Sequence, residues 1–133
     1  MEEIRIPVSP GELIDKLTIL RIKSERISDT DKLANVRHEE AALAAAAKVL
    51  PESKELSALR DRLLAINEEL WDIEDGIRDC ERAGDFGAEF VRLARAVYLT
   101  NDRRAEVKKA INLLLGSALV EEKSYADYGP DAR

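Results

Sequence analysis

The feature of this sequence that most constrains the fold is an apolar heptad pattern in the middle of the chain. Apolar residues alternate there at spacings of three and four, at Leu56, Leu59, Leu63, Ile66, Leu70, Ile73, Ile77 and Cys80. Only an α-helix places residues with these spacings on one face, and a period of 3.5 residues keeps that face against a partner helix. The pattern predicts a long helix over residues 53–83.

A second stretch with the same pattern follows after a very short connection. Gly84 is typical of a helix end, and Asp85 is predicted to cap the next helix. The apolar spacing resumes at Phe86 and continues to Ala118, with Arg104 at one core position. A tight turn between two long amphipathic helices makes them antiparallel, so we predict a hairpin of residues 53–83 and 86–118.

The N-terminal part of the chain predicts one or two further helices. Ser9-Pro10-Gly11-Glu12 has the residues of a capped helix start, and an apolar face continues from there to about Ile27. Another helix is predicted from about Ser28 to Leu50. Because Leu64 and Trp71 lie outside the seam of the hairpin, we expect the first N-terminal helix to cover that flank.

Together these elements predict an all-α fold, in which the long antiparallel hairpin packs with one or two N-terminal helices as a three- to four-helix bundle. Residues 1–133 are expected to form a single helical domain. Ile4, Ile6 and Val8 alternate with polar or turn residues, which predicts an extended arm over residues 1–8. Residues 121–133 are predicted to be a polar tail.

Composition excludes several classes of function. A net charge of -6 opposes binding to a nucleic acid backbone. A single cysteine, Cys80, excludes an intrachain disulfide, and Cys80 with the single His38 supplies no zinc-binding set, so we expect no metal and no cofactor. No apolar run reaches the roughly 18 residues of a membrane helix. We therefore expect a cytoplasmic protein without a membrane or nucleic acid partner.

The hairpin geometry places particular polar residues together. With the turn centred on Gly84 and Asp85, residues whose numbers sum to about 169 lie at the same level, so Trp71 is predicted opposite Tyr98 and Asn67 close to Asn101. These four side chains are expected to form a groove on one flank of the hairpin. The candidate ligand-binding residues are Asn67, Trp71, Arg78, Tyr98, Asn101, Arg104 and Lys108.

Two interpretations of these residues stay open at the level of sequence. Arg104 at a core position would be a register-fixing contact if an acid such as Glu69 pairs with it, or a cationic centre for a ligand carboxylate or phosphate together with Arg103 and Lys108. In the same way, the polar groove residues either form a satisfied network beneath the first helix or line a pocket.

Three stretches carry a family likeness. They are Ser9 to Leu20 (SPGELIDKLTIL), Ile66 to Asp75 (INEELWDIED), and Ala94 to Ala105 (ARAVYLTNDRRA) with Ile111 and Asn112. Together they resemble a family of short, uncharacterised bacterial proteins that is defined only as a domain of unknown function. The resemblance spans Ser9 to about Tyr125; it implies a bacterial source and supplies no activity.

A looser similarity links residues 13–17 (LIDKL) to the first helix of the helical chorismate mutases. Those enzymes bind a dicarboxylate with arginines and a lysine inside an intertwined dimer. Glu12 stands near the place where that family has a basic residue.

Our leading hypothesis from sequence is a non-catalytic helical module that interacts with other proteins and self-associates, with a dimer as the expected homo-oligomer. The alternative is a small anionic-metabolite binder or a chorismate-mutase-like enzyme that uses the arginines of the bundle. We favour the hypothesis without enzymatic activity, because the sequence contains no assembled catalytic set.

Overall fold

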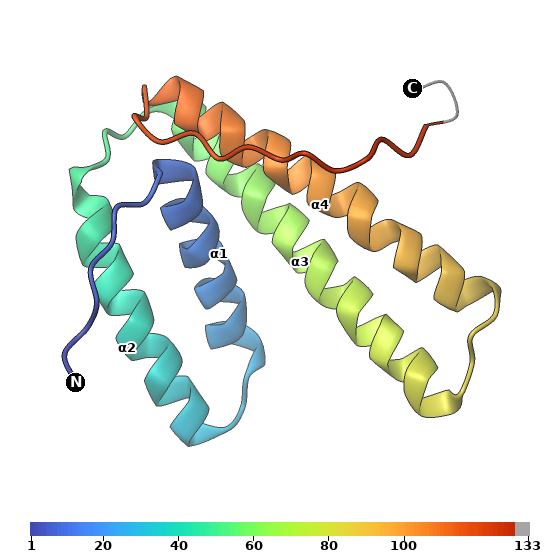
Figure 1. The fold of residues 1–133 in the computed structure, drawn as a ribbon. Coiled ribbons are helices and arrows are strands. Elements are labelled where there is room, and N and C mark those ends of the chain that lie inside the picture. Colours follow the sequence, from blue (N-terminus) through green and yellow to red (C-terminus); the bar gives the residue numbers. More distant parts are fainter. Residues whose placement is uncertain (130–133) are drawn as a thin grey trace.

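The computed structural model describes residues 1–129, and the part of the chain that it describes contains helices and no β-strand. The helices are α1 (Pro10–Arg26), α2 (Thr30–Ala46), a short 3-10 helix (Ala47–Val49), α3 (Lys54–Ala83) and α4 (Ala88–Leu114) (Figure 1). The predicted all-α fold is therefore confirmed.

Short polar side chains cap the N-termini of α1, α2 and α3. The hydroxyl of Ser9 accepts a hydrogen bond from the backbone N–H of Glu12 at 3.2 Å, and Ser53 accepts one from Leu56 at 3.0 Å. Asp29 caps α2 through the N–H of Lys32 at 2.9 Å. Each cap satisfies a backbone donor that the first turn of a helix leaves without an intrahelical partner.

The connection between α3 and α4 differs in detail from the prediction. Gly84 ends α3 in the left-handed conformation, with φ at +67°. The prediction that Asp85 caps α4 was wrong, because its carboxylate accepts from Gly87 N–H at 3.0 Å and so folds the loop before the helix. As a result α4 begins at Ala88, two residues later than predicted, and it ends at Leu114 before Gly116, whose φ is +63°.

The helices α3 and α4 lie side by side and antiparallel along their length (Figure 1). The prediction of which residues of α3 and α4 lie opposite each other agrees with the position of Gly76, where an added Cβ would lie 3.0 Å from Leu93 Cδ1. The numbers of these two residues sum to 169. Towards the turn, the hairpin has a small core of its own, in which Ile73, Cys80 and Leu93 are buried.

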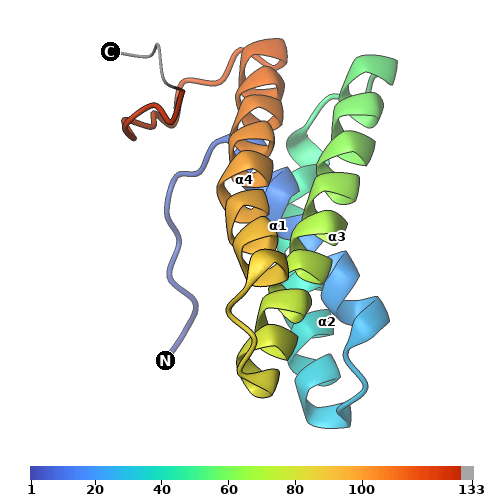
Figure 2. The ribbon, with the colours of Figure 1, turned by 90° about the vertical axis from the view of Figure 1, so that its right-hand side faces the viewer.

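Helix α1 packs into the flank of the hairpin, as predicted, and contacts both α3 and α4. The main core lies at this junction and consists of Ile14, Leu56, Leu63, Ile66, Val107 and Ile111, each at most 3% exposed. Helix α2 lies on the far side of α1 from the hairpin, and among the described helices it contacts only α1 and the 3-10 helix (Figures 1 and 2). Val36 is its single buried residue.

Residues at both ends of the described chain form no helix. Residues 1–9 are extended, and Figure 2 shows this arm standing away from the helices. The segment after α4 runs back along that helix (Figure 1), so that the ring of Tyr128 lies 5.4 Å from that of Tyr98. The last four residues of the predicted polar tail, 130–133, lie outside the described residues.

None of the helices found between residues 1 and 129 is both long enough and apolar enough to cross a membrane.

A substitution at Gly11 tests how closely α1 approaches α4. A Cβ there would lie 2.5 Å from the backbone oxygen of Lys108 and 2.9 Å from Asn112 Oδ1, so Gly11→Ala must push the two helices apart. We expect a loss of about 1–3 kcal/mol in the free energy of unfolding, which is typical of overpacking. The measurement is urea unfolding followed by circular dichroism.

The control is Lys16→Ala, an exposed position on the same helix, which should stay within about 0.5 kcal/mol of the unmodified protein. Equal stability of the Gly11→Ala variant would show that α1 and α4 do not pack as described.

Candidate functional site

A buried carboxylate connects the three helices of the bundle at their junction. Asp15 on α1 is 1% exposed. Its Oδ1 accepts a hydrogen bond from Arg104 Nε at 2.9 Å, and its Oδ2 accepts a second from Arg104 Nη2, so a guanidinium of α4 binds the carboxylate through two parallel bonds. Two-point pairing of this kind fixes geometry as well as adding energy.

An amide from α3 completes this contact. Asn67 Nδ2 donates to Asp15 Oδ1 at 2.9 Å and to Thr18 Oγ1 at 2.8 Å, while the Thr18 hydroxyl donates to the backbone oxygen of Asp15 at 2.7 Å. We call these four side chains, Asp15, Thr18, Asn67 and Arg104, the junction network. Among the described residues no fully buried side-chain nitrogen or oxygen lacks a partner, so the network is satisfied.

One turn further along α4, a second cation faces α1. Lys108 Nζ donates to Glu12 Oε2 at 2.7 Å and to Glu121 Oε2 at 3.1 Å, and the lysine side chain is 13% exposed. Burial acts to lower the pKa of Lys108, but the hydrogen bonds to Glu12 and Glu121 outweigh burial, so its pKa is raised above 10.5.

The prediction of an acidic partner for Arg104 on α3 was wrong. Glu69, which was predicted to pair with Arg104, instead accepts from Arg103 at 3.1 Å on the exposed side of the hairpin. The sequence pattern placed Arg104 between α3 and α4 only, whereas the structure places α1 over this position. The nearest acid is therefore supplied by α1, and Asp15 raises the pKa of Arg104 by hydrogen bonding to its guanidinium.

Beside the junction network lies a groove that contains most of the predicted site residues. It has a volume of about 470 Å³, and we call it the tryptophan groove; its lining residues are Ile19, Asn67, Leu70, Trp71, Glu74, Asp75, Arg78, Asn101 and Arg104. The structure thus brings Asn67, Trp71, Arg78, Asn101 and Arg104 together. Arg78 is held by Glu74 at 2.7 Å, and Arg26 of α1 lies 5.8 Å from the Trp71 ring centroid.

Two predicted site residues lie elsewhere. Tyr98, expected opposite Trp71, does not line the tryptophan groove; it packs against Tyr128 and lines a surface hollow with Asp102 and Tyr125. Its side chain stays 42% exposed on α4, and the returning C-terminal segment packs against its ring through Tyr128. The hydrogen bond to Asp102 raises the pKa of Tyr128. Lys108 lies in a separate pocket.

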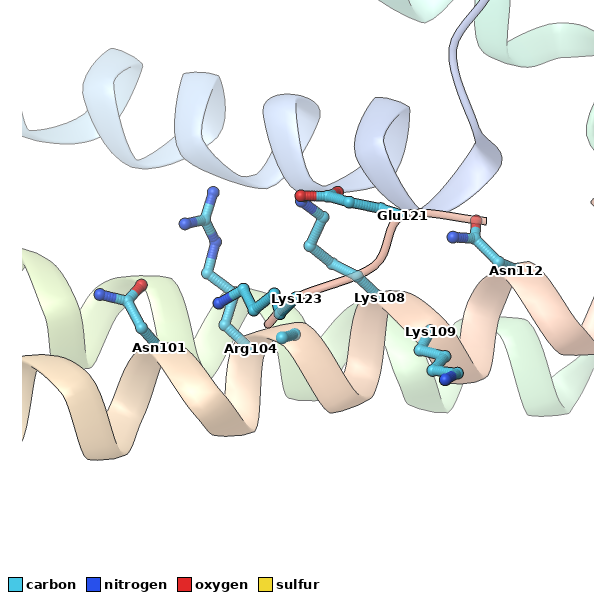
Figure 3. A pocket seen from close by; sticks show the side chains of 8 residues that line it. Asn101, Arg104, Lys108, Lys109, Asn112, Glu121 and Lys123 are labelled. Carbon is cyan, nitrogen blue, oxygen red and sulfur yellow. The ribbon is translucent and has the colours of Figure 1, made fainter. Parts of the chain in front are cut away.

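That separate pocket is small and rich in cations. It has a volume of about 90 Å³, and we call it the basic pocket; its lining residues are Asn101, Arg104, Ala105, Lys108, Lys109, Asn112, Glu121 and Lys123 (Figure 3). Figure 3 shows Lys108 and Glu121 meeting in front of α1, with Lys123 extending towards Arg104. Arg104 and Asn101 line both this pocket and the tryptophan groove.

A third concavity was missed by the sequence analysis. It has a volume of about 450 Å³ and lies among α1, α2 and the N-terminal part of α3; we call it the apolar groove. Its lining includes Ile14, Leu17, Ala44, Leu50 and Leu64, with charged residues at the edge. Leu64 outside the heptad seam was the available signal, but the sequence did not show that α2 leaves this side chain half-buried.

The isolated reactive residues have no partners that would activate them. Burial raises the pKa of the Cys80 thiol, and the nearby carboxylates of Asp85 and Glu89 raise it further, which disfavours the nucleophilic thiolate. Within residues 1–129, no group of three or more histidine, cysteine, aspartate and glutamate side chains has an arrangement that could hold a metal ion.

Comparison with known proteins places the chain in a family. The family described as a family of unknown function (DUF6165) matches residues 4–130, and the chain belongs to it. The predicted resemblance to a domain of unknown function is thereby confirmed. No curated protein and no solved structure matches this chain.

The contribution of the junction network is measurable by removing the charge of Asp15. We expect Asp15→Asn to lower the free energy of unfolding by about 3 kcal/mol, because it leaves the Arg104 guanidinium, 29% exposed, without a counter-charge. Replacing both residues, as in Asp15→Leu with Arg104→Met, should cost less than the single change. Chemical denaturation of Asp15→Leu, Arg104→Met and the double variant gives the coupling energy.

The matched control is an exposed ion pair of the neighbouring arginine on α4, between Arg103 and Glu69 of α3. Glu69→Gln and Arg103→Gln, singly and together, should give a coupling of about 0.2–1 kcal/mol. A coupling for Asp15 and Arg104 as small as this would contradict a structural role for the junction network.

The raised pKa of Lys108 predicts a loss of stability in alkaline solution. Because the folded-state pKa exceeds the unfolded value, the charged lysine stabilises the protein fully below pH 10.5, and this contribution is lost as the pH rises through the folded-state pKa. Arginine stays charged there. Lys108→Arg should therefore lose less stability than the unmodified protein as the pH rises above 10.5 in thermal melts.

Lys109→Arg is the control, since Lys109 is exposed and has no ion pair with a described residue. Its stability should follow that of the unmodified protein over the same pH range, and a difference as large as that of Lys108→Arg would show that Lys108 is not responsible.

Proposed function

We propose that this chain, as a member of a family to which no function is assigned, is a non-catalytic helical module that self-associates. The association that its surface favours is a dimer in which each copy places its N-terminal arm in the apolar groove of the other. A two-fold axis would make the two contacts equivalent and close the assembly.

The observation that carries this proposal is the exposure of the apolar residues of the arm. Ile4 is 76% exposed, Ile6 70% and Val8 41%. Among the described residues, the side chains of the arm form one hydrogen bond, from Arg5 to Glu3 at 3.2 Å, and both of its partners belong to the arm. Fully burying an isoleucine side chain stabilises a structure by about 1.5–3 kcal/mol. A site that buries Ile4 and Ile6 would therefore stabilise the association by several kcal/mol.

The apolar groove has properties that suit this arm. Its lining exposes Leu17, Leu50 and Leu64, and its volume of about 450 Å³ lies within the roughly 300–1,000 Å³ of sites that enclose small apolar groups. No residue of the arm lines this groove in the same chain. Eight extended residues span roughly 26 Å, which is sufficient to cross from one copy to its neighbour.

Charge also favours the arm as occupant. The arm carries Glu2 and Glu3 beside Arg5. The edge of the apolar groove carries side chains of both charges. The basic ones are Arg21, Lys48 and Arg60, and the acidic ones are Glu40, Glu52 and Asp61. Complementary charges at the rim of an interface fix its register and exclude other partners.

The enzymatic alternative receives less support, because its central cation is already engaged. Arg104 Nε and Nη2 both donate to Asp15, so the guanidinium face expected to bind a substrate dicarboxylate is used inside the protein. A cytoplasmic location, a bacterial source and a reduced Cys80 belong to the same proposal.

The test is the mass of the chain in solution, measured by sedimentation over a wide concentration range. We expect a species of twice 14.9 kDa. Ile4→Glu with Ile6→Glu should shift the equilibrium towards monomer by far more than about 100-fold, since about 3 kcal/mol or more of apolar burial is lost for each of the two arms of the dimer. Phe86→Glu with Leu113→Glu adds the same charge at other exposed apolar positions and should leave the dimer intact.

A second pair of variants tests the groove itself. Ala44→Glu fills the apolar groove from its α2 wall, whereas Ala42→Glu makes the same change at an exposed position of α2 that does not line it. Only Ala44→Glu should weaken the dimer. A strict monomer at all concentrations, or a dimer unaffected by both the arm and the Ala44 substitutions, would overturn the proposal.

A further inference from the structure

The basic pocket already holds one carboxylate, which comes from the C-terminal segment. Glu121 Oε2 accepts from Lys108 Nζ at 3.1 Å, but the Glu121 side chain is 55% exposed and belongs to a segment without secondary structure. By contrast, the other acceptor of Lys108, Glu12, lies in the first turn of α1 and is 30% exposed. The Glu121 contact is therefore the weaker and more easily replaced of the two.

A largely buried asparagine presents its amide nitrogen to the same pocket. Asn112 is 3% exposed, and its Oδ1 accepts from the backbone N–H of Gly11 at 2.8 Å. Its Nδ2 takes part in no hydrogen bond with any residue up to 129, and Figure 3 shows this nitrogen on the side of the amide that faces Lys108. Since no fully buried side-chain nitrogen of the described residues lacks a partner, this Nδ2 is accessible from the pocket and is free to donate to an acceptor that enters it.

The charge and the size of the basic pocket indicate which kind of chemical group this acceptor is. The lining of the basic pocket contains four cationic side chains, Arg104, Lys108, Lys109 and Lys123, and one acidic side chain, Glu121. The volume of about 90 Å³ is several times the roughly 10–15 Å³ that one water molecule needs, so the pocket has room for a small group. This space suits a single compact anionic group, and several N–H donors around one point are the arrangement that binds oxyanions.

We infer that the basic pocket binds the oxyanion group of a small ligand, a carboxylate or a phosphate, in place of the carboxylate of Glu121. The ligand oxygens would accept from Lys108 Nζ and Asn112 Nδ2, and Lys123 would approach from the C-terminal segment. Glu121 then acts as an intramolecular competitor that occupies Lys108 when no ligand is bound. This inference does not depend on self-association, because the arm and the apolar groove contribute no residue to the pocket.

The experiment titrates the full chain with inorganic phosphate and, separately, with succinate, with sodium chloride added to hold the ionic strength constant. Binding is followed by ¹H–¹⁵N spectra, in which the Asn112 side-chain amide and the Gly11 backbone amide report on the pocket. We expect saturable shifts of these signals with at least one of the two probes. Binding of phosphate alone would identify a phosphate site, and binding of succinate alone a carboxylate site.

Variants of the C-terminal segment give the sharper test, because they leave the helical core unchanged. Glu121→Gln removes the competitor and should tighten binding roughly twofold to fivefold, the effect of losing one exposed ion pair. Lys123→Gln should weaken binding by a similar factor. Lys48→Gln, which removes an exposed lysine outside the pocket, should have no effect.

Lys108→Met should abolish binding, and it is combined with Glu12→Gln so that no acid of α1 is left without its cation. Circular dichroism verifies that this variant is folded. The inference is overturned if the Glu121→Gln variant shows no saturable shift with either probe, if sodium chloride alone produces the same shifts, or if Glu121→Gln and Lys123→Gln both bind like the unmodified chain.

Discussion

The arrangement of the helices depends on the ion pair between Asp15 and Arg104. Helix α1 carries a carboxylate that is 1% exposed, and such a charge is tolerated only with a partner in good geometry. Arg104 supplies that partner from α4, and Asn67 joins from α3. Apolar burial alone would let α1 rotate or slide on the hairpin, whereas a two-point ion pair has one position. The pair therefore selects the register in which three helices meet.

Residues of the junction network also line three concavities on the surface of the bundle. Asn67 and Arg104 belong to the junction network and also line the tryptophan groove; Arg104 further lines the basic pocket, and Thr18 lines the apolar groove. The stretches that carry the family resemblance supply most of these residues, at the start of α1, the middle of α3 and the middle of α4.

Sequence periodicity was sufficient for the hairpin but not for what packs on it. The heptad spacing from Leu56 to Cys80 determines which face of α3 is buried, and the glycine at position 84 determines where the chain turns, so the level of every residue on α4 followed. The partner of Arg104 did not follow, because Asp15 is remote in sequence and occupies a position that the apolar pattern of α1 leaves unmarked. The position of Tyr98 was predicted only from its distance to the turn, and this prediction did not include the C-terminal segment that packs against Tyr98. The apolar groove depends on a gap between two helices, which no pattern within one helix describes.

The attachment of α2 to α1 alone has a consequence for motion. Proteins open locally in cooperative units, and the units with the fewest buried contacts open at the lowest free energy. With Val36 as its only buried residue, α2 is such a unit, and it can detach without breaking any bond of the junction network. Helix α2 also forms one wall of the apolar groove, so this wall belongs to the described α-helix with the fewest buried residues. An occupant bound in the groove would therefore hold α2 against α1 and suppress its local opening. Its binding would slow amide hydrogen exchange along α2.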